Sequence, residues 1–263
     1  MSLDNCRLML SRQNRYEFSF ASIIGTRKTQ EDYFGIISSE NAIAACVCDG
    51  MGGLEYGAQA SEMSINVFFD QITPNIDNCA DATKEFYTSM LDKMDHNVHL
   101  IKRPDGTRAS AGSTIISVFI SNYTMKWLSV GDSSIFLLRD GDITQMNTFH
   151  NYQTKLNEKY LAGQIDRDYF VKESRKGHAL ISYIGVGELK LIDISKTTVD
   201  VQKNDVVLLC SDGITGYISP ENINKAIMGK SAKKAVDLLM NQLVQTSQGK
   251  PLDNATVILI RIK

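Results

Sequence analysis

The stretch AIAACVCDGMGG, residues 42–53, decides the fold. It opens with a continuous apolar run of the length that is typical of a buried strand. The run ends in Asp49, and Gly50, Gly52 and Gly53 follow almost at once. Because glycine has no side chain, the backbone next to the acid can approach a ligand closely. The stretch therefore predicts a buried strand that carries a carboxylate and accessible backbone to its end.

The same combination of an apolar run and a terminal acid recurs along the chain. KWLSVGD ends at Asp132 and VVLLCSD ends at Asp212, whereas EDYFGII begins with Glu31 and Asp32, and DNATVILI begins with Asp253. In antiparallel sheets the end of one strand lies beside the start of its neighbour. We therefore expect all of these carboxylates to share one rim.

Turn signals between the apolar runs favour largely antiparallel sheets. The four residues 121–124, SNYT, and 139–142, RDGD, are typical of tight hairpins, the second through its Asp-Gly pair. Helical spacing of apolar residues follows the glycine-rich stretch and recurs in two later blocks, and Ser219 and Ser231 are good helix starts. The apolar stripes are Ala60, Met63, Ser64 and Val67; Phe86, Met90, Met94, Val98 and Ile101; and Val236, Leu239 and Leu243. Helices laid on antiparallel sheets predict a layered α+β fold.

Length and composition limit the class of protein. With 263 residues and no linker or repeat, we expect a single domain over 1–263. The net charge of −2 leaves no overall field for nucleic acid or an anionic membrane. No apolar stretch approaches a membrane span, and the N-terminus lacks a signal-peptide plan, so we expect a cytoplasmic protein without a membrane partner. The five cysteines fit small buried side chains in a reducing compartment, and one Cys46/Cys48 pair is a weak signal for a soft metal.

Residues 151–177 are rich in charge and poor in strand signals. Two interpretations stay open for them. The segment could form a small mobile subdomain or lid beside the site, or it could form a solvated pair of helices.

Several carboxylates cannot gather on one rim without compensation. Two like charges about 4 Å apart repel by roughly 4 kcal/mol at an effective dielectric near 20, and a multivalent cation removes the conflict. Oxygen ligands without a matching histidine favour Mg²⁺ or Mn²⁺ over Zn²⁺. Each acid taken alone could instead be an ordinary turn or cap residue. Arg27, four residues before Glu31, could hold a phosphoryl group beside the ions or simply pair with Glu31 or Asp32.

Six ordered motifs carry a resemblance that covers about residues 18–261. They are Arg-x-x-x-Glu-Asp at 27–32, Asp-Gly-Met-Gly-Gly at 49–53, Ala-Gly-Ser-Thr at 111–114, Val-Gly-Asp-Ser at 130–133, Cys-Ser-Asp-Gly at 210–213 and Asp-Asn at 253–254. In their order and spacing they resemble the metal-dependent serine/threonine protein phosphatases of type 2C, the PPM family, in its bacterial form. The resemblance implies a four-layer αββα sandwich with two facing antiparallel sheets and helices outside. It also implies that residues 151–177 form the family's variable flap.

The resemblance further implies roles for the matching residues. Asp49 would bridge two Mn²⁺ or Mg²⁺ ions, with the Gly50 carbonyl on the first ion and with Asp212 and Asp253 on the second. Glu31 and Asp32 would act near the metals through bound water, and Asp132 with Asp212 would serve a third, weaker position. Arg27 would hold the substrate phosphate. A hydroxide bridging the metals would attack phosphoserine or phosphothreonine, so Arg27 and Asp49 are the expected catalytic pair.

Three positions depart from the family pattern. Met51 stands where some members have a histidine, which leaves no side chain there to act as a general acid. Phe149 stands where an acid is expected, and His150 beside it is a weak candidate for anything beyond packing. Gln30 replaces a common asparagine with little change in hydrogen-bonding capacity.

Two other functions remain as alternatives. A catalytically silent phosphoprotein-binding module would have lost one or more of Asp49, Asp212 and Asp253, and all three are present. A metal-dependent phosphodiesterase or nuclease would need a basic track, which the sequence lacks. We expect a protein phosphatase that opposes a serine/threonine kinase in signalling and works as a monomer on phosphorylated proteins.

Overall fold

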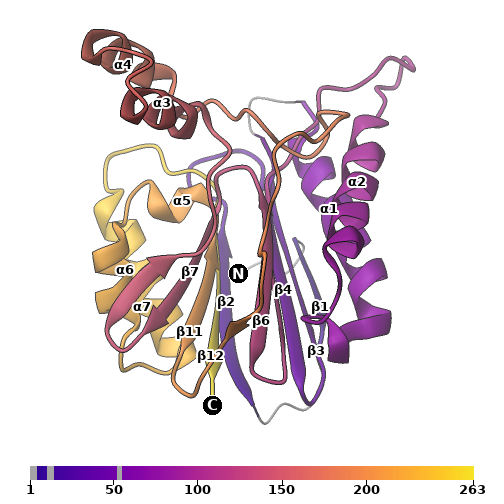
Figure 1. Ribbon diagram of the computed structural model, residues 1–263, viewed down its shortest axis with the longest axis vertical. Helices are drawn as coiled ribbons and strands as arrows, with labels where there is room; N and C mark the ends of the chain where they lie inside the picture. The colour runs from indigo at the N-terminus through magenta and orange to yellow at the C-terminus, as the bar shows by residue number, and fades with distance from the viewer. Residues whose placement is uncertain (1–4, 11–14, 52–54) are drawn as a thin grey trace.

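Two β-sheets lie face to face with helices on both outer sides, as the computed structural model shows (Figure 1). The structure describes residues 5–10, 15–51 and 55–263, so Gly52 and Gly53 of the opening stretch lie outside it. The predicted four-layer αββα arrangement is confirmed.

The first sheet has the strand order β1-β3-β4-β5-β6-β10, with β9 also paired to β6. Its strands are β1 (Cys6–Met9), β3 (Asp32–Ser38), β4 (Ala42–Asp49), β5 (Ile115–Ser121), β6 (Thr124–Val130), β9 (Asp193–Ile194) and β10 (Val199–Asp200). The pair β1/β3 is parallel, with Cys6 opposite Phe34, and every other pair is antiparallel. The expectation of largely antiparallel sheets therefore holds, with one parallel pair at the edge.

The second sheet is antiparallel throughout, in the order β2-β12-β11-β7-β8. Its strands are β2 (Tyr16–Ile23), β7 (Ser134–Arg139), β8 (Asp142–Gln145), β11 (Val206–Cys210) and β12 (Ala255–Ile262). The chain passes from the first sheet to the second between β6 and β7, so that turn joins both sheets at one end.

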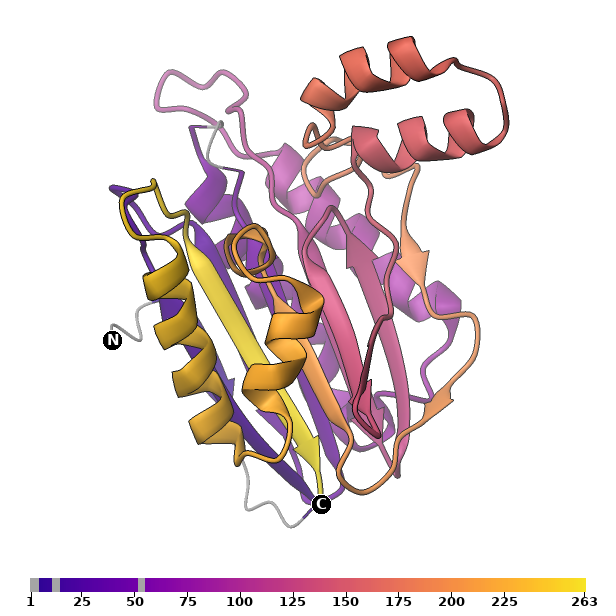
Figure 2. The same ribbon diagram turned by 90° about the vertical axis from the view of Figure 1, so that its left-hand side faces the viewer.

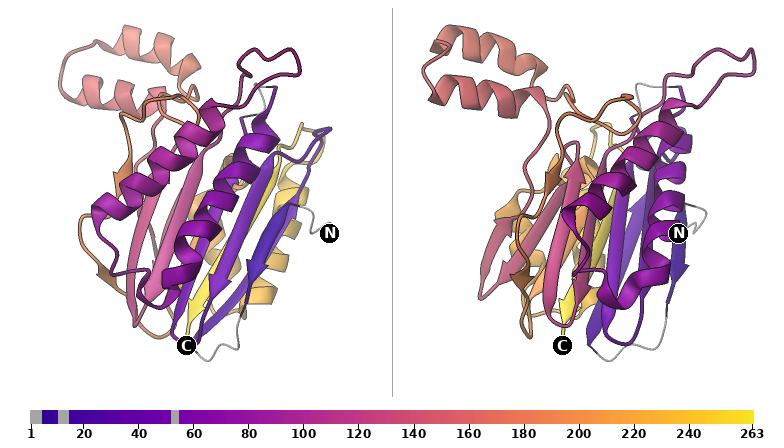
Figure 3. Two further views of the ribbon diagram at one scale, coloured as in Figure 1. Left: turned by 90° about the vertical axis from the view of Figure 1, so that its right-hand side faces the viewer. Right: turned by 45° about the vertical axis from the view of Figure 1, so that its right-hand side comes forward.

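Helices cover the outer face of each sheet (Figures 1 and 3). The helices are α1 (Gly57–Ile72), η1 (Thr73–Asn78), α2 (Lys84–His99), α3 (Tyr152–Leu161), α4 (Arg167–Glu173), η2 (Ser174–Lys176), α5 (Asp212–Thr215), α6 (Pro220–Ile227) and α7 (Ala232–Thr246). Ser219 and Ser231 precede α6 and α7 as predicted, and the Ser231 hydroxyl accepts the Lys234 N–H. Within the described part of the chain, every helix is too short or too polar to span a bilayer.

Strand alternation produces three apolar layers. On β4, Ala44, Cys46 and Cys48 face α1 and α2, whereas Ala45 and Val47 face the second sheet. The third layer lies between the second sheet and α5, α6 and α7. No disulfide joins the five cysteines, all of which lie in the described part of the chain.

Both predicted hairpins are present. Asn122 and Tyr123 have φ of 49° and 63° between β5 and β6, and Asp140 and Gly141 have φ of 52° and 96° between β7 and β8. Two successive positive φ values are typical of the tight turn whose twist matches that of the strands.

The charge-rich segment 151–177 forms the helices α3 and α4, which project from the body at the end where α5 begins (Figures 1 and 2). Tyr160 and Phe170 stack with ring centroids 4.8 Å apart, and Leu156 is the buried residue of α3. The segment is thus a pair of helices, and its role as a lid beside the site stays a prediction. We call residues 151–177 the flap.

Two adjacent leucines on α7 test the layering. Leu239 is 1% exposed and packs on the second sheet, whereas Leu238 is 37% exposed. Leu239→Ala should lower the free energy of unfolding by about 2–5 kcal/mol because it leaves a cavity. Leu238→Ala serves as the matched control and should cost about 1 kcal/mol or less. Denaturant unfolding measures both, and equal losses would contradict the placement of this helix.

Candidate active site

The ends of several strands bring the predicted acids together. Asp49 is the last residue of β4 and pairs directly with Asp32, the first residue of β3. Asp212 opens α5 directly after β11, and Asp253 lies two residues before β12, the strand beside β11. Asp132 lies in the turn from β6 to β7, where the chain changes sheets. The acids therefore gather at one end of both sheets.

Close backbone packing draws two of these acids together. A Cβ atom on Gly213 would overlap the carbonyl oxygen of Asn254, so the start of α5 lies directly against the start of β12. On the other sheet, a Cβ atom on Gly50 would lie 2.5 Å from the carbonyl oxygen of Gly57. Glycine is therefore required at both positions for the site to close.

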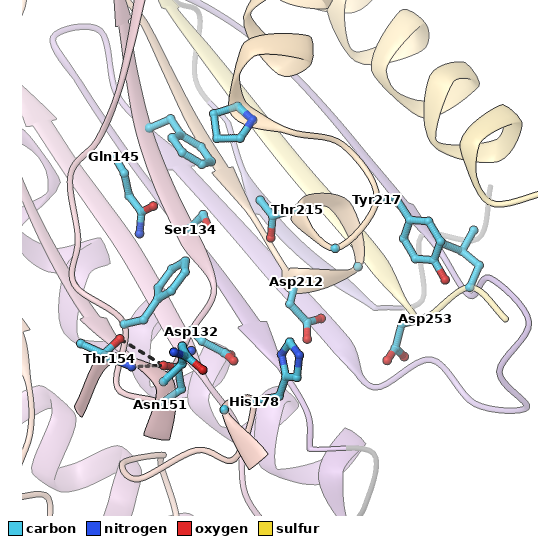
Figure 4. Close-up of a pocket in the computed structure, with 18 of the residues that line it drawn as sticks. Asp132, Ser134, Gln145, Asn151, Thr154, His178, Asp212, Thr215, Tyr217 and Asp253 are labelled. Atoms are coloured by element: carbon cyan, nitrogen blue, oxygen red, sulfur yellow. Dashed lines mark hydrogen bonds between the residues drawn. The ribbon is translucent and has the colours of Figure 1, made fainter. Parts of the chain in front are cut away.

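Two neighbouring cavities open at this end. The smaller, of about 270 Å³, is lined by Asp49, Gly50, Met51, Thr114, Asp132, His178, Ala179, Leu180, Asp212 and Asp253. The larger, of about 630 Å³, also includes Asp132, His178, Asp212 and Asp253 and extends past Arg27 (Figure 4). Five of the predicted site residues thus line the smaller cavity, and Arg27 lines the larger one.

Burial and mutual repulsion raise the pKa of the acids. Burial, followed by the charges of Asp32 and Asp212, holds the pKa of Asp49 well above its usual range. Burial raises the pKa of Asp32 to about 7, although the nearby hydroxyls of Thr256 and Ser211 lower it. Burial and the charge of Asp212 raise the pKa of Asp132 to about 6. Burial also raises the pKa of Asp212, and the charge of Asp253 adds to this effect. The site thus holds more negative charge than its own surroundings compensate.

Glu31 and Asp32 lie behind the cavities and line neither of them. Asp32 is fully buried; its Oδ2 accepts the Ser211 hydroxyl at 2.8 Å, and its Oδ1 has no hydrogen-bond partner within the described part of the chain. The carbonyl of Glu31 accepts the Gly50 N–H. An unpartnered buried carboxylate oxygen beside Asp49 fits a hard cation and the water around it.

No three His, Cys, Asp or Glu side chains converge closely enough on one point to hold an ion, within the residues that the structure describes. The acids instead surround the cavity. Their donors are all oxygens, in agreement with Mg²⁺ or Mn²⁺.

Arg27 pairs with an acid from the other end of the chain. Its Nη2 lies 2.5 Å from Oδ2 of Asp253, and the two side chains are 47% and 41% exposed. The ion pair considered from the sequence was with Glu31 or Asp32, and the structure shows Asp253 in this place. One donor of the guanidinium is engaged there, which leaves the rest of its planar fork at the cavity wall.

Neutral side chains clamp the acids in place. Asn254 accepts the Glu31 N–H at 2.8 Å and donates to the carbonyls of Ile24 and Thr29. Thr114 accepts the Asp49 N–H. Thr114 and Asn254 both lie inside motifs quoted from the sequence. Their hydrogen-bond partners are distant along the chain, so the motifs did not predict these bonds.

Two departures from the family pattern have structural roles. His150 is buried, its ring Nδ1 accepts the Gly131 N–H, and its backbone N–H donates to the Gly131 carbonyl. It lines neither cavity, so it supports the turn before Asp132. Gln30 accepts the Asp32 N–H and donates to Ser22, so its side-chain oxygen and nitrogen are both hydrogen-bonded.

The sequence did not point to two residues that border the flap, Asn151 at its start and His178 directly after it. Asn151 caps α3 by accepting the Thr154 N–H, and its hydrogen bond to Asp132 lowers the pKa of that acid. His178 lines both cavities, and Figure 4 shows it beside Asp132 and Asp212 in the larger one. A lone histidine in a charged segment carries no sequence signal for this position.

Asn254 offers a test of the clamp. Asn254→Ala leaves one N–H and two carbonyls without their partner, so the free energy of unfolding should fall by about 2–4 kcal/mol. Asn241→Ala, on the exposed face of α7, is the control and should change it by less than about 0.5 kcal/mol. Chemical denaturation compares the two, and a loss at Asn254 no larger than that at Asn241 would refute the clamp.

Comparisons with known proteins agree with this geometry. The chain is 25% identical to the serine/threonine phosphatase stp of Listeria welshimeri over 239 residues, which cover 89% of this chain and 90% of that protein. The structure of the phosphatase Stp1 from Staphylococcus aureus superposes with a TM-score of 0.78 at 20% identity and covers 97% and 98% of the two chains. The catalytic domain of the phosphatase PstP, solved with two manganese ions, matches with a TM-score of 0.73 at 21% identity over 94% and 98%. The family model for protein phosphatase 2C matches residues 21–256, and the chain therefore belongs to the protein phosphatase 2C family.

Proposed function

We propose that this chain removes phosphate from phosphoserine and phosphothreonine in proteins with the help of two Mn²⁺ or Mg²⁺ ions. The observation that carries the proposal is the gathering of Asp49, Asp132, Asp212 and Asp253 around two adjoining cavities, the first three with raised pKa values and the last paired with Arg27, which lies on the wall of the larger cavity. Serine/threonine phosphatases among the relatives support the choice of substrate.

The donors around the smaller cavity are suited to hold the ions. Asp49 and the Gly50 carbonyl would bind the first, and Asp49, Asp212 and Asp253 the second. Asp132 would serve a weaker third position with Asp212. When bound, such ions lower the pKa of a water molecule between them and offset the charge that develops on the phosphoryl group.

The protein's own residues would position the substrate and the acids. Arg27 would bind two phosphate oxygens through its planar guanidinium group. One of its N–H donors is paired with the Asp253 carboxylate in this structure. Asp32, held by Ser211, and Glu31, held by Asn254, would support the inner acids through ordered water. Arg27 and Asp49 are thus the expected catalytic pair.

We further propose that residues 1–263 act as one catalytic unit whose flap at 151–177 influences the choice of substrate. The charged exterior of the flap and its place outside the acidic strand ends support this role. A cytoplasmic, monomeric enzyme of signalling that opposes a serine/threonine kinase is the setting we propose; the near balance of charge and the reduced cysteines support it.

Metal removal and one ligand variant test the proposal. The chain should hydrolyse p-nitrophenyl phosphate and a phosphothreonine peptide with Mn²⁺ and lose this activity in EDTA. Asp212→Asn should lower kcat/KM by more than roughly hundredfold, because a carboxylate of the metal site is lost. Asp237→Asn, an exposed acid on α7, is the matched control and should stay within about twofold. Activity that survives EDTA would contradict the proposal.

Arg27 is tested by two substitutions. Arg27→Ala should lower kcat/KM for the phosphopeptide by roughly 10²–10³-fold, because a charge-assisted contact to phosphate is lost. Arg27→Lys keeps the charge and loses the fork, so it should fall between the alanine variant and the unsubstituted chain. Steady-state kinetics at saturating Mn²⁺ measure both. A lysine variant as active as the original would exclude bidentate binding.

A further inference from the structure

The larger cavity is bigger than a phosphoryl group requires. Its volume of about 630 Å³ lies in the range of sites that enclose whole ligands of several hundred daltons. It runs from the acids along the outer face of the second sheet, between the start of the flap and α5 (Figure 4). A substrate bound by its phosphate at the acids would therefore have neighbouring groups inside this space.

The lining of the cavity changes with distance from the acids. All of its charged side chains, Arg27, Asp132, Asp212 and Asp253, belong to the site already described. The remaining wall is neutral, and it combines three aromatic side chains with a larger number of hydroxyl and amide side chains. Its members are Ser134, Phe136, Gln145, Phe149, Asn151, Gln153, Thr154, Asn157, Thr215, Tyr217, Pro220, Pro251 and Leu252, with glycines and His178 between them.

Ser134 is an independent sign that this wall meets a ligand. Its side chain is fully buried and lines the cavity, yet its Oγ makes no hydrogen bond within the described part of the chain. A buried polar group without a partner costs about 1–3 kcal/mol. Ser134 begins β7 two residues after Asp132, and Phe136 follows on the same face of the strand. The unpartnered hydroxyl of Ser134 thus lies between Asp132 and Phe136 along the chain.

We propose that the wall formed by Ser134, Phe136 and Phe149, here called the apolar subsite, binds the peptide beside the phosphorylated residue. The proposal rests on the phosphatase function proposed above. A large apolar side chain such as leucine packs against the two phenylalanines, and the Ser134 hydroxyl bonds the peptide main chain. Continuity with the acid site supports a substrate segment as the occupant, because both cavities share Asp132, His178, Asp212 and Asp253.

Charge narrows the class of substrate further. An acidic residue that reaches the far wall would find no cation there, because Arg27 lies among the acids, and would lose hydration. A lysine or arginine that reaches the far wall would find no carboxylate there and would lose hydration. The subsite therefore favours substrate peptides with an apolar residue at this position over peptides with an acidic or a basic residue there.

Phosphothreonine peptides that differ at one position test the selection. Leucine, alanine, aspartate and lysine are placed in turn at each of the neighbouring positions, and kcat/KM is measured with Mn²⁺. At one of these positions leucine should exceed alanine by roughly tenfold, and aspartate and lysine should lie below alanine. A ratio between two peptides does not depend on the fraction of enzyme that is folded, so it remains meaningful for a weakened variant.

Two substitutions at Phe149 assign the preference to the subsite. Phe149→Ala should reduce the ratio of leucine to alanine peptide to about twofold or less, whereas Phe149→Leu should keep most of it, because an apolar contact remains. Tyr169→Ala is the control on the flap; this exposed aromatic does not line the cavity and should leave the ratio unchanged. Ser134→Ala should lower both peptides alike, by roughly threefold relative to p-nitrophenyl phosphate, which has no main chain to bind.

The outcomes separate this inference from the function on which it rests. Equal rates for leucine and alanine at every position, or a ratio that survives Phe149→Ala, would overturn the apolar subsite and leave the phosphatase function standing. Failure to hydrolyse either p-nitrophenyl phosphate or any peptide would overturn both.

Discussion

The structure depends on the repulsion among carboxylates that strands from two different sheets deliver to one end. Asp49 and Asp32 are cross-strand neighbours, and Asp132, Asp212 and Asp253 come from turns of the facing sheet or from the link between the sheets. At an effective dielectric near 20, each close pair costs several kcal/mol when ionised. The raised pKa values of these acids express that cost. Burial of the three apolar layers must supply the folding free energy that offsets this repulsion. Cations that bind the acids would remove the repulsion and stabilise the folded state.

Hydrogen bonds from neutral side chains to the backbone fix the segments that carry the acids. Asn254 fixes the loop from Ile24 to Glu31 against the start of β12, and Thr114 fixes the end of β4. Gly213 allows α5 to lie against Asn254, so that Asp212 and Asp253 face the same cavity. The flap, in contrast, projects from the body and has Leu156 as the buried residue of its first helix (Figure 2).

Much of the fold and the acid set could be predicted because local patterns determine them. Continuous apolar runs ending in Asp49 and Asp212, and the turns at 121–124 and 139–142, are signals that lie within a few residues. The pairing of Arg27 with Asp253 joins residues 226 apart, and no local pattern reports it. The parallel pair β1/β3 depends on the route of the chain between sheets, and the orphan hydroxyl of Ser134 depends on the shape of a cavity. The sequence therefore indicated which acids gather at the strand ends, but it did not predict the contacts between residues far apart along the chain.

The central claim is that the acids form a metal site, and locating the ions tests it most directly. A crystal of the chain grown with Mn²⁺ would show each ion by its anomalous scattering, independently of activity. We expect two ions in the smaller cavity, with an oxygen of Asp49 within about 2.0–2.3 Å of both and with Asp212 on one of them. Asp49→Asn crystals grown in the same way should lose at least one ion. A cavity without Mn²⁺, or ions that do not touch Asp49, would contradict the account.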